Sequence, residues 1–331
     1  MNMRRRTFIS AIPATLAACA VGFGKSGAAE APRVIEYRLP RANAFPHDPA
    51  LAPDGMVWYA DQATSHVGRL DPASGAVVDV ATPTPNAGPH GITVAPDGMV
   101  WFTENSAGRI GRLDPAHMTI REFTLPPEIR DPHTLLVIDG KVWFDAQGSN
   151  YYGVLDPAAG HADVHKIDID HALPYGMALA PDRYLWIALF GTNRLGRVTL
   201  ATQTMREFSL PNAGARPRRI TIDSHGAVWY TDYPRSMLGR FDPASGHAQE
   251  WPSPQPESAP YGIALGADGR VWYDESQANT MVGFDPRSAT SKTIPIPTPG
   301  ATVRNIAPDP KRRCLWLALS GTGRIGKLEL G

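Results

Sequence analysis

A tryptophan recurs along almost the whole chain at spacings of 42 to 44 residues. The seven copies are Trp58, Trp101, Trp143, Trp186, Trp229, Trp272 and Trp316. Each copy contains four short runs rich in β-branched and aromatic residues, separated by turn sequences such as Ala-Pro-Asp-Gly. A period of this length with four strands per unit is typical of a β-propeller blade. The repeat therefore predicts an all-β, seven-bladed β-propeller of four-stranded blades, formed as one domain by residues 33–330.

The two ends of the repeat indicate how the ring closes. The last copy stops at its third run, "RIGKLEL" (324–330), whereas "VIEYRLP" (34–40) matches the fourth run of other copies, such as "IREFTLP". We expect this N-terminal strand to complete the last blade, because it would pair an otherwise open sheet edge. The repeated tryptophans are expected to pack between blades rather than to bind a ligand.

Composition supports this fold and excludes some partners. The chain has 31 Gly and 32 Pro, which favours a turn-dense β structure. Its 32 basic residues balance 32 acidic ones, with no run of more than three consecutive basic residues, so we expect no nucleic-acid partner. We expect a monomer. Cys19 and Cys314 are the only cysteines, and Cys314 is expected to be a small buried apolar residue.

Residues 1–29 have the composition of an export signal. Arg4 to Arg6 are followed by an apolar stretch from Phe8 and by small residues before Glu30. The stretch resembles a twin-arginine signal, which predicts a periplasmic or secreted protein, cleaved after residue 29. Alternatively, "LAAC" (16–19) resembles a lipoprotein box that would leave a lipid anchor on Cys19. A membrane span is not expected, because the stretch is short and contains a proline.

One position near the start of each copy varies in a way that suggests a site. If the first two runs of the second copy form a hairpin, residue 94 pairs with 99, 92 with 101 and 90 with 103, so that His90 and Glu104 lie at the same end of the blade. The first strand of a propeller blade lines the central channel. The residue after the opening Pro, or its equivalent, then stands at the channel mouth in every copy: His47, His90, His133, Tyr175, Arg218, Tyr261 and Arg304.

These residue types favour a small-molecule site. Tyrosines and arginines would bind an anionic or carbonyl-bearing ligand, and a histidine beside a carboxylate can act as a general base. Acids near the ends of the second runs would provide such carboxylates: Asp61, Glu104, Asp145, Asp232, Asp274 and Glu275. Alternatively, these side chains satisfy one another and bound water in a polar channel without catalysis.

The segment "PHGITVAPDGMVWFTENSAGRIGRLDP" and its six copies resemble the virginiamycin B lyase (streptogramin B lyase) family. The resemblance implies elimination-type opening of a cyclic depsipeptide at its ester, hence antibiotic resistance, with a histidine base and a magnesium ion held by carboxylates. The family's last-blade histidine and acids are replaced here, since Thr302, Arg304 and Ser320 stand at the matching positions and Tyr261 stands in the preceding blade.

Because a propeller is nearly cyclic, the family's residues can be sought in other blades. His133 would then be the catalytic base, His90 a second catalytic residue that contacts the substrate, and Asp131 a metal ligand. Gln147 replaces a further acid, so that Glu104 or Asp145 would have to complete a Mg2+ site.

His47, Tyr175, Arg218, Tyr261 and Arg304 would bind the substrate in the channel. Two alternatives to the lyase remain, a non-catalytic binding propeller for a small molecule or protein, and a lactone hydrolase.

Overall fold

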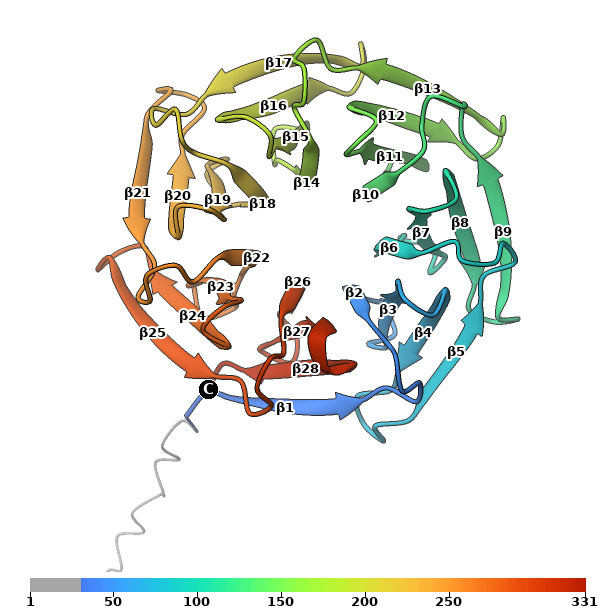
Figure 1. The fold of residues 1–331 in the computed structure, drawn as a ribbon, viewed down its shortest axis with the longest axis horizontal. Helices are drawn as coiled ribbons and strands as arrows, with labels where there is room; N and C mark the ends of the chain where they lie inside the picture. Colours follow the sequence, from blue (N-terminus) through green and yellow to red (C-terminus); the bar gives the residue numbers. More distant parts are fainter. Residues whose placement is uncertain (1–30) are drawn as a thin grey trace, which may run out of the picture. The chain divides into compact units, whose positions relative to one another are not determined.

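The computed structural model describes residues 31–331, which form a ring of seven four-stranded antiparallel sheets (Figure 1). The sheets follow one another round the ring in chain order, from blade 1 (β2–β5) to blade 7, in which β26–β28 are joined by β1. The predicted fold class is confirmed. Within residues 31–331 no helix is long and apolar enough to cross a membrane. The predicted export signal lies outside the described residues.

Each blade runs from an inner first strand to an outer fourth strand (Figure 1). The first strands are β2 (Pro46–Leu51), β6 (Pro89–Val94), β10 (Pro132–Ile138), β14 (Pro174–Leu179), β18 (Pro217–Ile222), β22 (Pro260–Leu265) and β26 (Val303–Asp309). The second strands are β3 (Val57–Asp61), β7 (Val100–Glu104), β11 (Lys141–Ala146), β15 (Tyr184–Leu189), β19 (Val228–Asp232), β23 (Val271–Glu275) and β27 (Cys314–Leu319). The third strands are β4 (His66–Leu70), β8 (Arg109–Asp114), β12 (Tyr151–Asp156), β16 (Arg194–Thr199), β20 (Met237–Phe241), β24 (Thr280–Asp285) and β28 (Arg324–Glu329). The fourth strands are β5 (Val77–Ala81), β9 (Thr119–Thr124), β13 (His161–Lys166), β17 (Thr204–Ser209), β21 (Ala248–Pro252), β25 (Thr290–Pro295) and β1 (Arg33–Arg38), and one 3-10 turn, η1 (Ser320–Thr322), follows β27.

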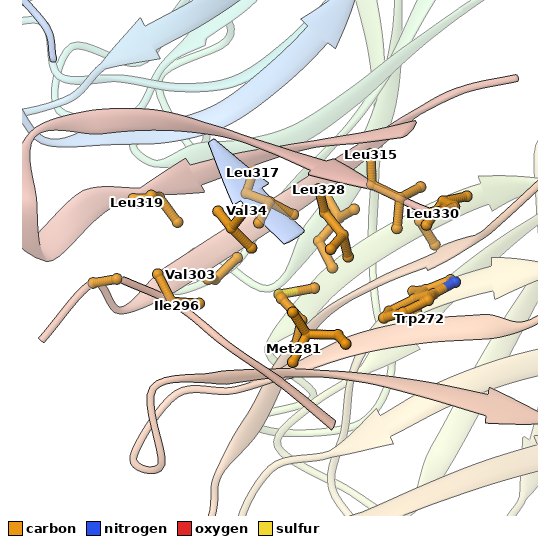
Figure 2. Close-up of a cluster of buried hydrophobic side chains, with 14 residues drawn as sticks. Val34, Trp272, Met281, Ile296, Val303, Leu315, Leu317, Leu319, Leu328 and Leu330 are labelled. Atoms are coloured by element: carbon orange, nitrogen blue, oxygen red, sulfur yellow. The ribbon is translucent and has the colours of Figure 1, made fainter. Parts of the chain in front are cut away.

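The N-terminal strand closes the ring as the sequence predicts. β1 pairs antiparallel with β28, so that Val34 lies opposite Leu328. The Val34 side chain is buried in one cluster with Leu328, Leu330 and Trp272 (Figure 2). Since Trp272 belongs to blade 6, this cluster joins the last two blades to the first strand of the chain.

The repeated tryptophans form the packing between blades, as expected. All seven are buried, with exposed fractions of 4% or less. Trp58 of blade 1 packs in one cluster with Val100 and Phe102 of blade 2, and Trp101 of blade 2 packs with Val142 and Phe144 of blade 3. Free Cys314 is also buried, in the cluster of Trp316. The ring is thus held by the same contact repeated from blade to blade.

Every first strand has a β-bulge within its first four residues. In blade 2, Val94 pairs with Val100 and Ile92 with Phe102, whereas Pro89 pairs with Glu104, which leaves one extra residue in β6. The same shift occurs in all seven blades. The register expected from the sequence was wrong by one residue and lacked the bulge, although His90 and Glu104 do lie at the same end of the hairpin. A bulge bends the strand and re-aims its side chains, and here it falls on the ring position and the residue after it.

We predict that Val34→Asp destabilises the whole propeller. A carboxylate without a partner would be buried between β1, β28 and blade 6, so the free energy of unfolding should fall by about 3 kcal/mol or more. Urea denaturation followed by tryptophan fluorescence measures this loss. Arg38→Ser, on the exposed end of the same strand, is the control and should stay within about 0.5 kcal/mol of the wild type. Equal stability of the Val34→Asp and wild-type proteins would show that β1 does not hold the ring.

Candidate functional site at the channel mouth

Four ring residues form a continuous stack across blades 1 to 4. The ring centroids of His47 and His90 lie 3.4 Å apart, those of His90 and His133 3.9 Å apart, and those of His133 and Tyr175 4.0 Å apart. The three histidine side chains are buried. The predicted histidines are therefore in direct contact, although each comes from a different blade.

Tyrosine and arginine complete the ring on the other side. The hydroxyl groups of Tyr175 and Tyr261 are hydrogen-bonded to each other, and Arg218 donates from Nη2 to the Tyr175 hydroxyl over 3.3 Å. The guanidinium carbon of Arg304 lies 5.0 Å from the centroid of the Tyr261 ring. All seven residues that the sequence places at the channel mouth thus converge.

The hydrogen bonds of the histidines define their tautomers. The Thr134 hydroxyl donates to the carbonyl of Tyr175 over 2.6 Å, so it accepts from Nδ1 of His133, which is 3.1 Å away. His90 places Nδ1 3.2 Å from the carbonyl of His133, and His47 places Nδ1 2.9 Å from a carboxylate oxygen of Asp48. In each ring Nδ1 therefore carries the hydrogen, and Nε2 is the nitrogen that can accept a proton.

Burial keeps the three imidazoles neutral. It is the largest cause that lowers the pKa of each, followed by the positive charge of Arg219 for His47, by His47 for His90, and by His90 for His133. Removing a charged group from water disfavours its charged form, and a second cation nearby adds to the effect. At neutral pH the stack is thus uncharged and has free lone pairs.

A buried ion pair that the sequence did not reveal joins blades 1 and 5 across the ring. Asp48 in blade 1 and Arg219 in blade 5 are each the second residue of their bulge, and Nη2 of Arg219 lies 2.7 Å from the Asp48 carboxylate. A cavity of about 430 Å³, lined by residues of all seven blades, includes both side chains. The bulged position after the ring residue is Gly in three copies and Asp, Thr, Arg or Asn in the others. That contrast was the only sign of this second layer.

Glycine at this second position lets neighbouring blades approach each other. A Cβ on Gly91 would lie 2.4 Å from the carbonyl oxygen of His133, and one on Gly176 would lie 2.8 Å from that of Arg218. Neither contact is possible without displacing backbone. The absent side chains are thus a condition for the close stacking of the ring.

Side chains at the ends of the second strands accept hydrogen bonds from the backbone of the bulges. Backbone N–H groups at the bulge of four blades donate to an oxygen of Thr103, Asp145, Thr231 or Asp274. Three further acids bind loop groups instead: Asp61 accepts from the backbone of Phe45, Asp232 pairs with Arg235, and Glu275 accepts from the backbone of Gln255. Most of the acids noted in the sequence therefore support the backbone around the ring.

The three predicted metal ligands have different surroundings. Asp131 accepts hydrogen bonds from the backbone and hydroxyl of Ser149 and from the backbone of Gly148, in the loop between β11 and β12. Burial raises the pKa of Glu104 to about 8, helped by Glu122, and both its carboxyl oxygens lack a partner. Burial also raises the pKa of Asp145, which accepts from the backbone of Thr134.

This donor set does not fit a magnesium ion. Mg2+ prefers ionised carboxylates that converge in octahedral geometry. The carboxylate of Asp131 is occupied by a loop, and across residues 31–331 no group of three or more His, Cys, Asp or Glu residues is placed to hold a metal.

Fold and side chains together define a class, a seven-bladed propeller with a polar cluster where its first strands converge. A model of the virginiamycin B lyase family matches residues 25–190 and 161–331, so the chain belongs to that family. A structure of streptogramin B lyase is 27% identical, with a TM-score of 0.83 over 91% of this chain and 98% of that chain. Virginiamycin B lyase from Staphylococcus aureus is also 27% identical, with a TM-score of 0.84 over 91% and 100%.

A catalytically inactive variant of the Staphylococcus aureus enzyme, solved with quinupristin, is 26% identical and covers the same shares of both chains, with a TM-score of 0.84. No curated protein sequence matches the chain.

We predict that the histidine stack makes the protein less stable in acid. As the pH falls below about 6.5, the unfolded histidines take up protons while the folded ones stay neutral, so stability is lost. The variant His90→Asn keeps a side-chain donor toward the His133 carbonyl but removes one buried imidazole that can take up a proton on unfolding. Below pH 6.5 the wild type should therefore lose more stability than the variant. The extra loss in its free energy of unfolding should be up to about 1.4 kcal/mol for each pH unit.

Urea denaturation at several pH values between 5 and 8 measures this difference. Comparison with the variant matters because raised carboxyl pKa values, about 8 for Glu104 and about 7 for Asp274, act in the opposite direction in both proteins. A difference that does not change with pH would mean that His90 has the same pKa in the folded and unfolded states, which contradicts the lowered pKa expected from its burial.

Proposed function

We propose that this protein is a carbon–oxygen lyase that opens a cyclic ester by elimination at the channel mouth, with His133 as the base. The observation that carries the proposal is the junction between His133 and Tyr175. There a neutral imidazole with a free Nε2 touches a tyrosine whose hydroxyl is linked to Arg218 and Tyr261. A proton acceptor and a set of donors for a developing oxyanion thus stand side by side.

The chemistry follows from this pairing. Nε2 of His133 takes the proton on the carbon next to a substrate carbonyl, and the electron pair left behind forms a carbon–carbon double bond. The bond from the β carbon to the ester oxygen breaks, and the carboxylate leaves with its electron pair. The carbonyl oxygen carries negative charge during the step and is stabilised by the Tyr175 hydroxyl, which Arg218 polarises. The imidazolium then releases its proton to water, which the lowered pKa of His133 favours.

The other ring residues bind and orient the substrate. Nε2 of His90 accepts a hydrogen bond from a substrate N–H, since its Nδ1 is engaged with the His133 carbonyl. His47, Tyr261 and Arg304 line the remaining arc of the mouth. Membership of the virginiamycin B lyase family and the similarity to a lyase solved with quinupristin support a cyclic depsipeptide as substrate. Export by the signal predicted over residues 1–29 would let the protein meet such an antibiotic outside the cytoplasm.

We predict that His133→Asn abolishes ring opening. The asparagine amide can still donate to Thr134, but the proton acceptor is lost, so turnover of quinupristin should fall by about 10²–10⁴-fold. Liquid chromatography with mass spectrometry follows the reaction, and an elimination product has the mass of the substrate, whereas a hydrolysis product gains one water. The exposed His117→Asn is the matched control and should retain full activity.

Undiminished turnover in His133→Asn would assign the base elsewhere, and a gain of one water would make the protein a lactone hydrolase instead. Loss of activity in His117→Asn would point to damage of the fold.

We also predict that the reaction does not need a divalent metal. The described residues supply no converging carboxylates, and Tyr175 with Arg218 provides the positive charge at the carbonyl. Turnover of quinupristin after exhaustive dialysis against EDTA should match that of untreated protein. Activity that is lost with EDTA and restored by Mg2+ would refute this mechanism and would support the magnesium site predicted from the family resemblance.

A further inference from the structure

Two arginines at the channel mouth have no anionic partner. Among residues 31–331 neither Arg218 nor Arg304 lies within ion-pair distance of a carboxylate, and both have a buried Nε without a hydrogen-bond partner. Their neighbours differ, since Arg219 pairs with Asp48 at 2.7 Å and Arg235 pairs with Asp232 at 2.8 Å. Both unpaired side chains are half-buried, so their charges are partly removed from water without compensation from the protein.

Aromatic rings hold these two guanidinium groups in place. The Cζ of Arg218 lies 4.0 Å from the ring centroid of Tyr261 and 4.3 Å from that of Tyr233. Arg304 packs on the same Tyr261 ring and on Phe45, at 5.0 and 5.7 Å. Stacking uses the flat faces of a guanidinium group, so the N–H donors at its edge remain available for a planar acceptor, apart from the Nη2 of Arg218 that donates to Tyr175.

The charge of the whole cluster favours an anion. Arg218, Arg219 and Arg304 all lie close enough to His47 to lower its pKa, and Asp48 is the only carboxylate paired with any of the three within the described chain. The cluster therefore carries excess positive charge beside a neutral histidine stack. An incoming anion would provide the missing countercharge.

We propose that Arg218 and Arg304 form a binding site for a carboxylate group on an organic ligand. The apolar and aromatic frame of Phe45, Phe190, Tyr233 and Tyr261 suits a carboxylate attached to a hydrocarbon or aromatic body better than a strongly hydrated inorganic anion. The site goes beyond the proposed elimination, because binding there needs no base and no bond cleavage. In a substrate it would select an ester that bears a free carboxylate.

The test is a titration of the full protein with benzoate, followed by calorimetry at low ionic strength. Benzamide has nearly the same shape without the charge and should bind at least tenfold more weakly. Arg304→Gln should reduce benzoate affinity by about tenfold or more, and Arg304→Lys, which keeps the charge but not the planar fork, should lie between it and the wild type. All proteins should melt at similar temperatures.

Arg121→Gln is the matched control. Arg121 also stacks on an aromatic ring, with its Cζ 4.5 Å from the Phe123 centroid, but it is exposed on the outer strand β9, so its loss should leave benzoate binding unchanged. Equal affinity for benzoate and benzamide, unchanged binding in Arg304→Gln, or displacement of benzoate by an equal concentration of inorganic phosphate would overturn the proposal. Repeating the titration in His133→Asn separates this result from the fate of the proposed reaction, because carboxylate binding should persist there.

Discussion

The candidate site depends on one constraint of the backbone, the β-bulge at the start of each first strand. A regular strand would alternate its side chains, so that only one of the two residues after the opening Pro faced inward. The extra residue breaks this alternation in all seven blades. It creates an outer layer of His, Tyr and Arg side chains and a second layer that contains the Asp48–Arg219 pair. The bulged backbone remains satisfied because second-strand residues such as Thr103 and Asp145 accept its N–H groups.

The two layers differ in how their charges are compensated. The Asp48–Arg219 pair neutralises itself in a buried position, where breaking it would leave an uncompensated charge. The outer layer has neutral histidines on blades 1 to 3 and unpaired arginines on blades 5 and 7. Burial is the main cause that lowers the pKa of His47 and His133, and the positive field of the arginines, Arg219 included, adds to it, so a proton removed from a substrate would not be held tightly. The same field would attract the substrate's carbonyl oxygen or an anionic group.

Most of the fold could be predicted from the sequence because the residues that determine it recur at a regular interval. Seven tryptophans at a nearly constant spacing determine the number of blades, and the match between residues 34–40 and other fourth strands correctly predicted closure by β1. The ring position could also be found, because it varies chemically while its surroundings repeat. The register and the bulge could not, since a single extra residue leaves hydrophobic spacing almost unchanged. Arg219 was missed for the same reason, because a straight strand would turn it away from Asp48.

The hydrogen-bond partners of individual side chains were harder to predict than the positions that recur in every blade. Asp131 stands two residues before His133 and suggested a metal ligand, but short-range hydrogen bonds to Gly148 and Ser149 tie its carboxylate to a loop. Glu104 lies at the expected end of its hairpin, yet it is near Glu122 in its own blade. Sequence spacing locates the end of a strand, whereas the direction of a carboxylate depends on which nearby N–H groups are free. Such donors come from loops whose geometry the repeat does not determine.

The near-cyclic symmetry of a propeller explains how a catalytic pair could lie in different blades from those of other family members. Every blade presents an equivalent bulge, so a base and a donor can be placed on any two adjacent blades with the same spacing. In this ring, histidines meet other residue types at two junctions, between blades 3 and 4 and between blades 7 and 1. At the second junction blade 7 contributes Arg304, whose positive charge acts on His47, and no tyrosine hydroxyl from blade 7 adjoins the imidazole. At the first, His133 stacks on Tyr175, whose hydroxyl is linked to Arg218. Only that junction combines a proton acceptor with a polarised donor from the neighbouring blade, which is why the proposed elimination is assigned to blades 3 and 4.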